Sequence, residues 1–412
     1  MTIVAALALM IIAAKPMRPG HIPGDRLITN LTERLKKEPG NTEIYYLIGR
    51  AHYATFSKAV ESSWSNRGEV EVYDHRQKDG LPIFYTLPGN IYPWDSKTAV
   101  KDTSDNRRHI EGAISSLRTA LNMTNGPGKI VKGLEDPGLA HLTLGCTFES
   151  GALLAGKVKL AEPLKNLVTT QQWRLAAASE YLLAFNSTIA EDRKVHEEPI
   201  WGLRSLVAYE AGLSYLRLQP ASKQSKGIKV EIDKLLKLPP PRMITPLVMD
   251  LTGSKPLTSL LDNSHQVEFD LDGSARPQTY GWVKPTTAFL VWDPFNEGKV
   301  TSGRQLFGNA TWWMLWDNAY AALDALDDNR DGWLSGKELK GLALWYDRNG
   351  NGISDPGEVI SINNTQIASI RTRFDGPQGE SFVSSQGVRL KDGRVLPTYD
   401  WVTTNVTPDA QH

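Results

Sequence analysis

The pattern of hydrophobic and polar positions divides the chain into two unlike halves. In the N-terminal half, apolar residues recur every three or four positions, as at Leu27 and Leu31, which predicts amphipathic α-helices. In the C-terminal half the period changes to two. Val267, Phe269 and Leu271 alternate with charged residues, as expected for a strand with one buried face. We therefore predict a multidomain α+β protein, in which an all-α helical part precedes a small α+β part.

A run of three prolines at residues 239–241 marks the change of period. Proline cannot continue a helix, and consecutive prolines form a stiff, extended spacer. We expect a linker over residues 237–247, between a helical domain over residues 21–236 and an α+β domain over residues 248–412. At 412 residues, the chain is long enough for two or three domains.

Short patterns in the helical half combine large residues with a glycine. They are Tyr45, Ile48, Gly49 and His52; then His141, Leu144, Gly145 and Phe148; and, more faintly, Ala211, Gly212 and Tyr215. Two further predicted helices, which would be the second helices of such repeats, show a small, a large and a small residue at helical spacing. These residues are Ala113, Leu117 and Ala120 in one helix and Ala177, Tyr181 and Ala184 in the other. These patterns resemble tetratricopeptide (TPR) repeats, in which the small residue lets neighbouring helices approach closely.

The repeats would be degenerate, because the three glycines are 96 and 67 residues apart rather than one period of about 34 residues. A generic helical bundle is the alternative. The resemblance implies a concave surface that binds a protein partner, and it implies no chemistry.

Residues 62–106 interrupt the helical pattern with several prolines, glycines and aromatic residues. Their length and their aromatic content favour a structured insertion that packs on the helices. The alternative is that this insertion lines a binding site.

Two twelve-residue segments in the C-terminal half match the EF-hand calcium pattern at every required position. We call residues 327–338 the first loop and residues 347–358 the second loop. The candidate ligands of the first loop are Asp327, Asn329, Asp331, Trp333, Ser335 and Glu338. Those of the second loop are Asp347, Asn349, Asn351, Ile353, Asp355 and Glu358.

The chemistry of calcium explains this choice of residues. Ca²⁺ takes 6–8 oxygen ligands, and alternate residues of a tight loop can direct that many oxygens to one centre. Trp333 and Ile353 would contribute backbone carbonyl oxygens. Gly332 and Gly352 stand at position 6, where the chain turns sharply and needs a positive φ. A polar surface turn is the alternative for a single match, but two full matches favour Ca²⁺ as the cofactor.

The segments beside the loops suggest an unusual arrangement. Residues 311–326 predict a tryptophan-rich helix that leads into the first loop. Only eight residues, 339–346, separate the loops, which predicts one short helix between them and leaves little room for the opening of a calcium switch. Residues 293–304 resemble a decayed third loop, because Phe295 replaces the position-3 ligand and Arg304 the position-12 ligand. We assign no metal to it.

Three further elements follow from local patterns. The apolar run at residues 288–292 predicts a strand, and Ile367 and Ile370 suggest a strand or a helix end at residues 366–371. Asp392-Gly393 lies between two apolar segments and predicts a β-hairpin.

The order of these motifs resembles a bacterial protein family. Residues 267–371 contain Asp270-Leu-Asp272-Gly273, Trp282, an apolar strand that ends at Asp293, the segment 303–308, both loops, and Ile367-Ala-Ser-Ile370. This series is similar to the calcium-binding region of secreted proteins of the hemolysin or RTX kind. The nonapeptide repeats common in that family are absent. The resemblance implies an extracytoplasmic domain that calcium stabilises, and it implies neither toxin activity nor catalysis.

Composition narrows the function further. The chain has 46 basic and 46 acidic residues, so no basic excess suggests a nucleic-acid partner. Cys146 is the only cysteine, so no intrachain disulfide can form. No HExxH, CxxC, GxSxG or phosphate-binding glycine motif occurs, so no catalytic residue is predicted.

The first residues predict export. Residues 1–20 begin with an apolar run, too short to span a bilayer comfortably, which resembles the apolar region of a secretory signal. A short anchor or a misassigned start codon are the alternatives. We therefore expect a periplasmic or secreted, calcium-binding, non-enzymatic protein with an unidentified protein partner on its helical domain. The alternative hypothesis is a calcium-stabilised exported enzyme or carbohydrate binder, with its site in the aromatic-rich region.

Overall fold

The computed structural model describes most of the chain. The described residues are 22–61, 104–124, 137–156, 159–195, 205–238, 244–273 and 277–406. The signal-like segment 1–20, all but the last three residues of the predicted insertion 62–106, and the three prolines of the linker lie outside the described residues.

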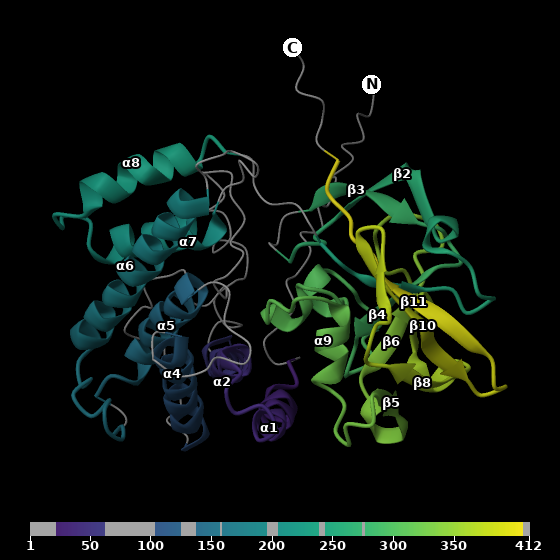
Figure 1. Cartoon of the computed structure of the whole chain (residues 1–412), viewed down its shortest axis with the longest axis horizontal. Helices are drawn as coiled ribbons and strands as arrows, with labels where there is room; N and C mark the ends of the chain where they lie inside the picture. The colour runs from purple at the N-terminus through teal and green to yellow at the C-terminus, as the bar shows by residue number, and fades with distance from the viewer. Residues whose placement is uncertain are drawn as a thin grey trace, which may run out of the picture.

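The described residues up to Leu238, which we call the helical half, are mostly helical. The helices are α1 (Gly24–Leu35), α2 (Thr42–Glu61), α4 (Ser104–Thr124), α5 (Pro137–Gly151), α6 (Thr170–Val195), α7 (Leu206–Leu218) and α8 (Ser225–Leu235), with a short 3₁₀ turn after α5. Each helix packs against the next one along the chain, so the helices form a stack from α1 to α8 (Figure 1). The all-α prediction for this half is confirmed.

Two of the repeat-like glycines lie at close helix crossings. A Cβ atom added to Gly49 of α2 would lie 2.6 Å from the side chain of Leu117 in α4. A Cβ atom added to Gly145 of α5 would lie 2.5 Å from the ring of Tyr181 in α6. The neighbouring helices therefore approach each other closely at both glycines, as the sequence predicts. The assignment to the TPR family stays a prediction.

The described residues from Ile244 onward, which we call the sheet half, form a nine-stranded antiparallel sheet and a separate two-stranded hairpin. The order of the strands in the sheet is β5-β8-β10-β11-β1-β4-β6-β7, with β9 beside β10. Their bounds are β1 Leu247–Met249, β4 Ala288–Trp292, β5 Trp333–Ser335, β6 Leu342–Trp345, β7 Val359–Ser361, β8 Ile367–Arg371, β9 Gly376–Gln378, β10 Ser381–Leu390 and β11 Val395–Asp400. The hairpin consists of β2 (Leu261–Phe269) and β3 (Gln278–Val283), and one helix, α9 (Ala319–Asp324), precedes the first loop.

The central strands β1, β4 and β6 are buried on both faces, and each face has a different cover. Successive residues of a strand point to opposite faces. In β4, Leu290 belongs to a core that continues into the helical half, whereas Phe289 and Val291 belong to a second core beneath the β2–β3 hairpin. The hairpin therefore covers one face of these strands, and the opposite face belongs to a core that residues 307–326 share with the helical half.

Several local predictions are confirmed. The predicted strand at residues 288–292 matches β4, and residues 366–371 contain β8. The predicted hairpin is β10–β11, and its turn places Gly393 at a φ of 88°. Among the described residues, no helix is long and apolar enough to cross a membrane.

The predicted helix over residues 311–326 is wrong in its first part. Residues Thr311–Trp313 form only a single 3₁₀ turn, η7, and α9 begins six residues later. Trp312, Trp313 and Leu315 have φ values of 52°, 59° and 60°, which a right-handed helix cannot accommodate. The buried guanidinium of Arg50, from α2, donates through Nε to the carbonyl oxygen of Trp313 (2.9 Å). Tertiary contacts therefore override the local helical pattern.

The predicted short helix between the two loops is also wrong. This segment contains β6, which pairs with β4 on one side and with β7 on the other. All four residues of β6 are buried, so the run shows no alternation of apolar and polar positions. A short, fully apolar run fits a buried strand as well as a helix, and here the sheet decides. The two loops are therefore not part of a helix–loop–helix pair.

We predict that Gly145→Ala destabilises the protein by about 1–3 kcal/mol, because its added methyl group overlaps the buried ring of Tyr181. Urea denaturation measures the effect. Gly227→Ala in α8 is the matched control, since nothing lies within 4 Å of its added Cβ atom, and it should stabilise the protein by about 0.5–1 kcal/mol. Equal stability of Gly145→Ala and the wild type would contradict a close α5–α6 crossing.

Candidate metal centre

The two loops occupy different places in the sheet half. The first loop follows α9, passes through β5 and ends in η8 (Gly336–Leu339). The second loop connects β6 to β7. Gly332 and Gly352, at position 6 of the two loops, have φ values of 86° and 71°. The sharp turn that the sequence predicts at position 6 is thus present in both loops.

The position-1 aspartates organise each turn. Asp327 Oδ1 accepts a hydrogen bond from the backbone N–H of Arg330 (2.6 Å), and its Oδ2 accepts one from Gly332 (2.8 Å). Asp347 repeats this with the N–H groups of Asn351 (3.1 Å) and Gly352 (2.8 Å). Both carboxylates are buried, with 2% and 0% of the residue exposed.

The position-12 glutamates fold back onto the start of each loop. Glu338 Oε1 accepts from the N–H groups of Asp328 (2.9 Å) and Asn329 (3.2 Å), and Oε2 accepts from Ser335 (2.9 Å). In the second loop, Glu358 accepts from Arg348 (2.8 Å) and Asp355 (3.1 Å). Both glutamates are buried. Position 12 therefore closes each loop around positions 2 and 9.

The side chains at positions 3 and 5 form short polar turns. In every case the side-chain oxygen accepts from the backbone N–H two residues further on. The four pairs are Asn329 with Asp331 (2.8 Å), Asp331 with Trp333 (2.8 Å), Asn349 with Asn351 (3.1 Å) and Asn351 with Ile353 (2.7 Å). The two loops thus share one hydrogen-bond frame.

Position 9 differs between the loops. Ser335 takes part in a capping box with Glu338 at the start of η8. Asp355 Oδ2 instead accepts from the side-chain amides of Asn349 (2.7 Å) and Asn351 (2.9 Å). These two amide donors lower the pKa of the Asp355 carboxyl group. Its carboxylate therefore stays ionised beside the position-3 and position-5 amides.

Burial raises the pKa of the position-1 carboxyl groups of Asp327 and Asp347, and the like charge of the position-12 glutamate in each loop raises it further. Among the described residues, no lysine or arginine forms an ion pair with Asp327, Asp347, Glu338 or Glu358. Each loop thus concentrates buried negative charge without a cationic side chain to balance it.

The described residues contain no cluster of three or more His, Cys, Asp and Glu side chains with the spacing of a metal site. Each loop instead has three candidate carboxylates, spread along its twelve residues, together with side-chain amide or hydroxyl and backbone carbonyl oxygens. Such a set of oxygen donors suits a hard cation such as Ca²⁺ rather than a transition metal.

The predicted decayed third loop keeps only the first half of the frame. Asp293 accepts from the N–H groups of Glu297 (2.8 Å) and Gly298 (2.9 Å). Arg304, at position 12, turns away: its Nε donates to the carbonyl oxygen of Gly273 (2.6 Å), and its guanidinium stacks on the ring of Trp313. A cationic side chain thus stands where the EF-hand pattern has its acidic position-12 ligand.

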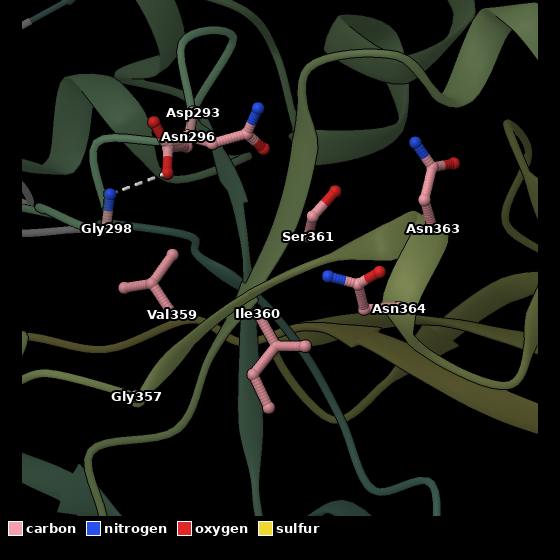
Figure 2. A pocket seen from close by; sticks show the side chains of 9 residues that line it. All are labelled: Asp293, Asn296, Gly298, Gly357, Val359, Ile360, Ser361, Asn363 and Asn364. Atoms are coloured by element: carbon pink, nitrogen blue, oxygen red, sulfur yellow. Dashed lines mark hydrogen bonds between the residues drawn. The ribbon is translucent and has the colours of Figure 1, made fainter.

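A polar cavity of about 550 Å³ lies beside this third turn and the end of the second loop (Figure 2). Figure 2 shows the Asp293–Gly298 hydrogen bond on one side and Ser361 and Asn364 on the other. The lining residues are Asp293, Asn296, Gly298, Gly357, Val359, Ile360, Ser361, Asn363 and Asn364. None of them is a candidate calcium ligand.

The tryptophans of the aromatic-rich region do not form a sugar-facing surface. Those at residues 282, 292, 312, 313, 316, 345 and 401 are buried in the two cores. Trp333 is partly exposed, and the guanidinium of Arg389 lies over its ring. These side chains stabilise the sheet half by packing, which is the simpler of the two interpretations of the aromatic content.

Two comparisons find similarity to known proteins. The family model described as SPM domain matches residues 247–402, which include the whole sheet, the β2–β3 hairpin and both loops. The chain is also similar to the iron-regulated protein FrpA of Neisseria meningitidis serogroup C, with 31% identity over 188 residues. That alignment covers 40% of this chain and 17% of FrpA, so the chain spans less than a fifth of the length of this relative.

We predict that Gly352→Ala is more destabilising than Gly357→Ala, by about 1–3 kcal/mol, when both are unfolded by urea in the presence of a calcium chelator. Both glycines have a positive φ, which costs an alanine about 1–2 kcal/mol. Only at Gly352 does the added Cβ atom also meet a neighbour, Val267 of β2, at 2.5 Å. Equal losses would show that the second loop does not pack tightly against the hairpin.

Proposed function

We propose that this chain is an exported, calcium-binding, non-enzymatic protein, in which Ca²⁺ at two EF-hand-type loops stabilises the fold and the helical half binds a protein partner. The observation that carries the proposal is the hydrogen-bond frame that both loops share. Two segments with different neighbours and different flanking elements hold positions 1, 3, 5, 6 and 12 in the same way.

The residues of the loops fit a divalent cation. A buried carboxylate without a cationic partner is costly, and a bound metal ion removes that cost. Asp327, Asp331 and Glu338 would hold the ion in the first loop with the Asn329 side chain, the Trp333 carbonyl and Ser335. Asp347, Asp355 and Glu358 would hold it in the second with Asn349, Asn351 and the Ile353 carbonyl. A bound Ca²⁺ supplies positive charge and fixed coordination at these positions.

The surroundings favour a structural role over a sensing role. A sensor opens by swinging two helices apart around each loop. Here the second loop joins two strands of the sheet, and the first loop contributes β5 to the same sheet through pairing with β8. Sites of this kind outside the cytoplasm typically bind calcium with a dissociation constant of about 10⁻⁴–10⁻³ M.

Export rests on the apolar N-terminal segment and on the resemblance of residues 267–371 to secreted proteins of the hemolysin or RTX kind. The similarity of part of the chain to the iron-regulated protein FrpA supports the proposal of export. The role of the helical half rests on its resemblance to repeat proteins that bind other proteins.

We predict that Glu338→Gln and Glu358→Gln each remove one of two calcium sites in calorimetric titration, because a bidentate carboxylate becomes a neutral amide. At 10 mM Ca²⁺, each intact site should add about 1.4–2.7 kcal/mol to the free energy of unfolding for the affinity range above. Glu380→Gln, an exposed position outside both loops, is the control and should bind two ions.

The proposal fails if the wild type takes up no calcium at millimolar concentration and melts at the same temperature in calcium and in chelator.

A further inference from the structure

Helix α1 of the helical half lies against the first loop, although about 300 residues separate them in the sequence (Figure 1). Arg26 is the centre of this contact. Its Nη2 atom donates to the carbonyl oxygen of Leu326 (2.5 Å), the residue before position 1, and to that of Glu338 at position 12 (3.4 Å). Its Nε atom donates to Asp328 Oδ1 (2.8 Å). One guanidinium thus bridges both ends of the first loop.

Further contacts extend this surface along the loop. Asn30 donates to the carbonyl oxygen of Ala325 (3.0 Å) and to Asp328 Oδ1 (2.8 Å). From the loop side, Arg330 at position 4 donates to the carbonyl oxygen of Glu33 (2.9 Å). Asp328 stands at position 2, which contributes no metal ligand in the EF-hand pattern. Helix α1 therefore contacts the frame of the loop, and none of these hydrogen bonds uses a candidate ligand side chain.

The second loop has different neighbours. Outside the hairpin, the backbone N–H of Val300 donates to Ser354 Oγ (2.8 Å); the β2–β3 hairpin contributes the other contacts described here. Trp282 Nε1 donates to Oδ2 of Asp347, the position-1 carboxylate (2.7 Å). His265 Nε2 lies 2.7 Å from the carbonyl oxygen of Gly350. Gly352 packs beneath Val267 so closely that no Cβ atom fits. The hairpin therefore contacts both the first position and the central turn of this loop.

We propose that the two calcium ions act on different junctions: the first loop holds the helical half on the sheet half through α1, and the second loop holds the β2–β3 hairpin on the nine-stranded sheet. This inference rests on the proposed calcium binding. Its physical basis is thermodynamic linkage between calcium binding and the docking of α1. An ion that closes the first loop fixes the carbonyl groups of Leu326 and Glu338, the two acceptors of Arg26, so ion binding and docking of α1 favour each other by the same factor.

The test uses the full chain and hydrogen–deuterium exchange with mass spectrometry, in calcium and in chelator. In calcium, Glu338→Gln should raise exchange in residues 24–35 and leave residues 261–283 as in the wild type. Glu358→Gln should have the reverse effect. Each variant is thus the matched control of the other, since both lose the same kind of ligand at the same position of a loop.

Arg26→Gln provides an independent test of this coupling, because Arg26 contacts no candidate ligand side chain. It should weaken calcium binding at the first loop by at least about fivefold, the lower end of typical coupling between sites, and leave the second loop unchanged. Arg107→Gln, whose side chain pairs with Glu111 within α4, should change neither affinity.

The outcomes separate the two proposals. If the chain takes up no calcium, both fail. If it binds two ions but exchange changes uniformly, or in neither region, or if Arg26→Gln leaves the first affinity unchanged, calcium binding stands and the division between the junctions is wrong.

Discussion

Strands β4 and β6 bury every one of their side chains, so the sheet requires a cover on each of its faces. The β2–β3 hairpin provides one cover, and residues 307–326 together with the helical half provide the other. The sheet half therefore depends on both covers for its apolar burial. The position of each cover is the main constraint on the rest of the fold.

Apolar burial holds a cover in place but defines its orientation only loosely, whereas hydrogen bonds to fixed loops define it closely. The loops supply such fixed points on both sides. Arg26 and Asn30 dock α1 on the first loop, and Trp282 docks the hairpin on the second. The buried carboxylates that form the candidate metal centres thus lie at the two junctions where the layers of the protein meet, and a bound ion there would stabilise the assembly of layers as well as the loop itself.

A second contact between the helical half and the sheet half has no role for metal. The guanidinium of Arg50 is fully buried and donates to the carbonyl oxygen of Trp313, in a segment where three residues have left-handed backbone conformations. Such conformations cost about 1–3 kcal/mol each and persist only where the surroundings stabilise them. Here the buried rings of Trp312 and Trp316 and the arginine of another layer do so. The turn therefore exists because the two halves pack on each other.

The sequence by itself determined the features that depend on neighbours along the chain. The loops are recognisable because a glycine turn and the ligand spacing from Asp327 to Glu338 are local, and the β10–β11 hairpin follows from Asp392-Gly393. Only the tertiary structure decided that residues 342–345 form a strand, because burial on both faces removes the alternation that distinguishes strand from helix. It also decided the turn at Trp312 and the contact of Arg26 with the first loop. The turn and the Arg26 contact depend on hydrogen bonds between residues that are more than 250 positions apart in the sequence, and no local pattern encodes such contacts.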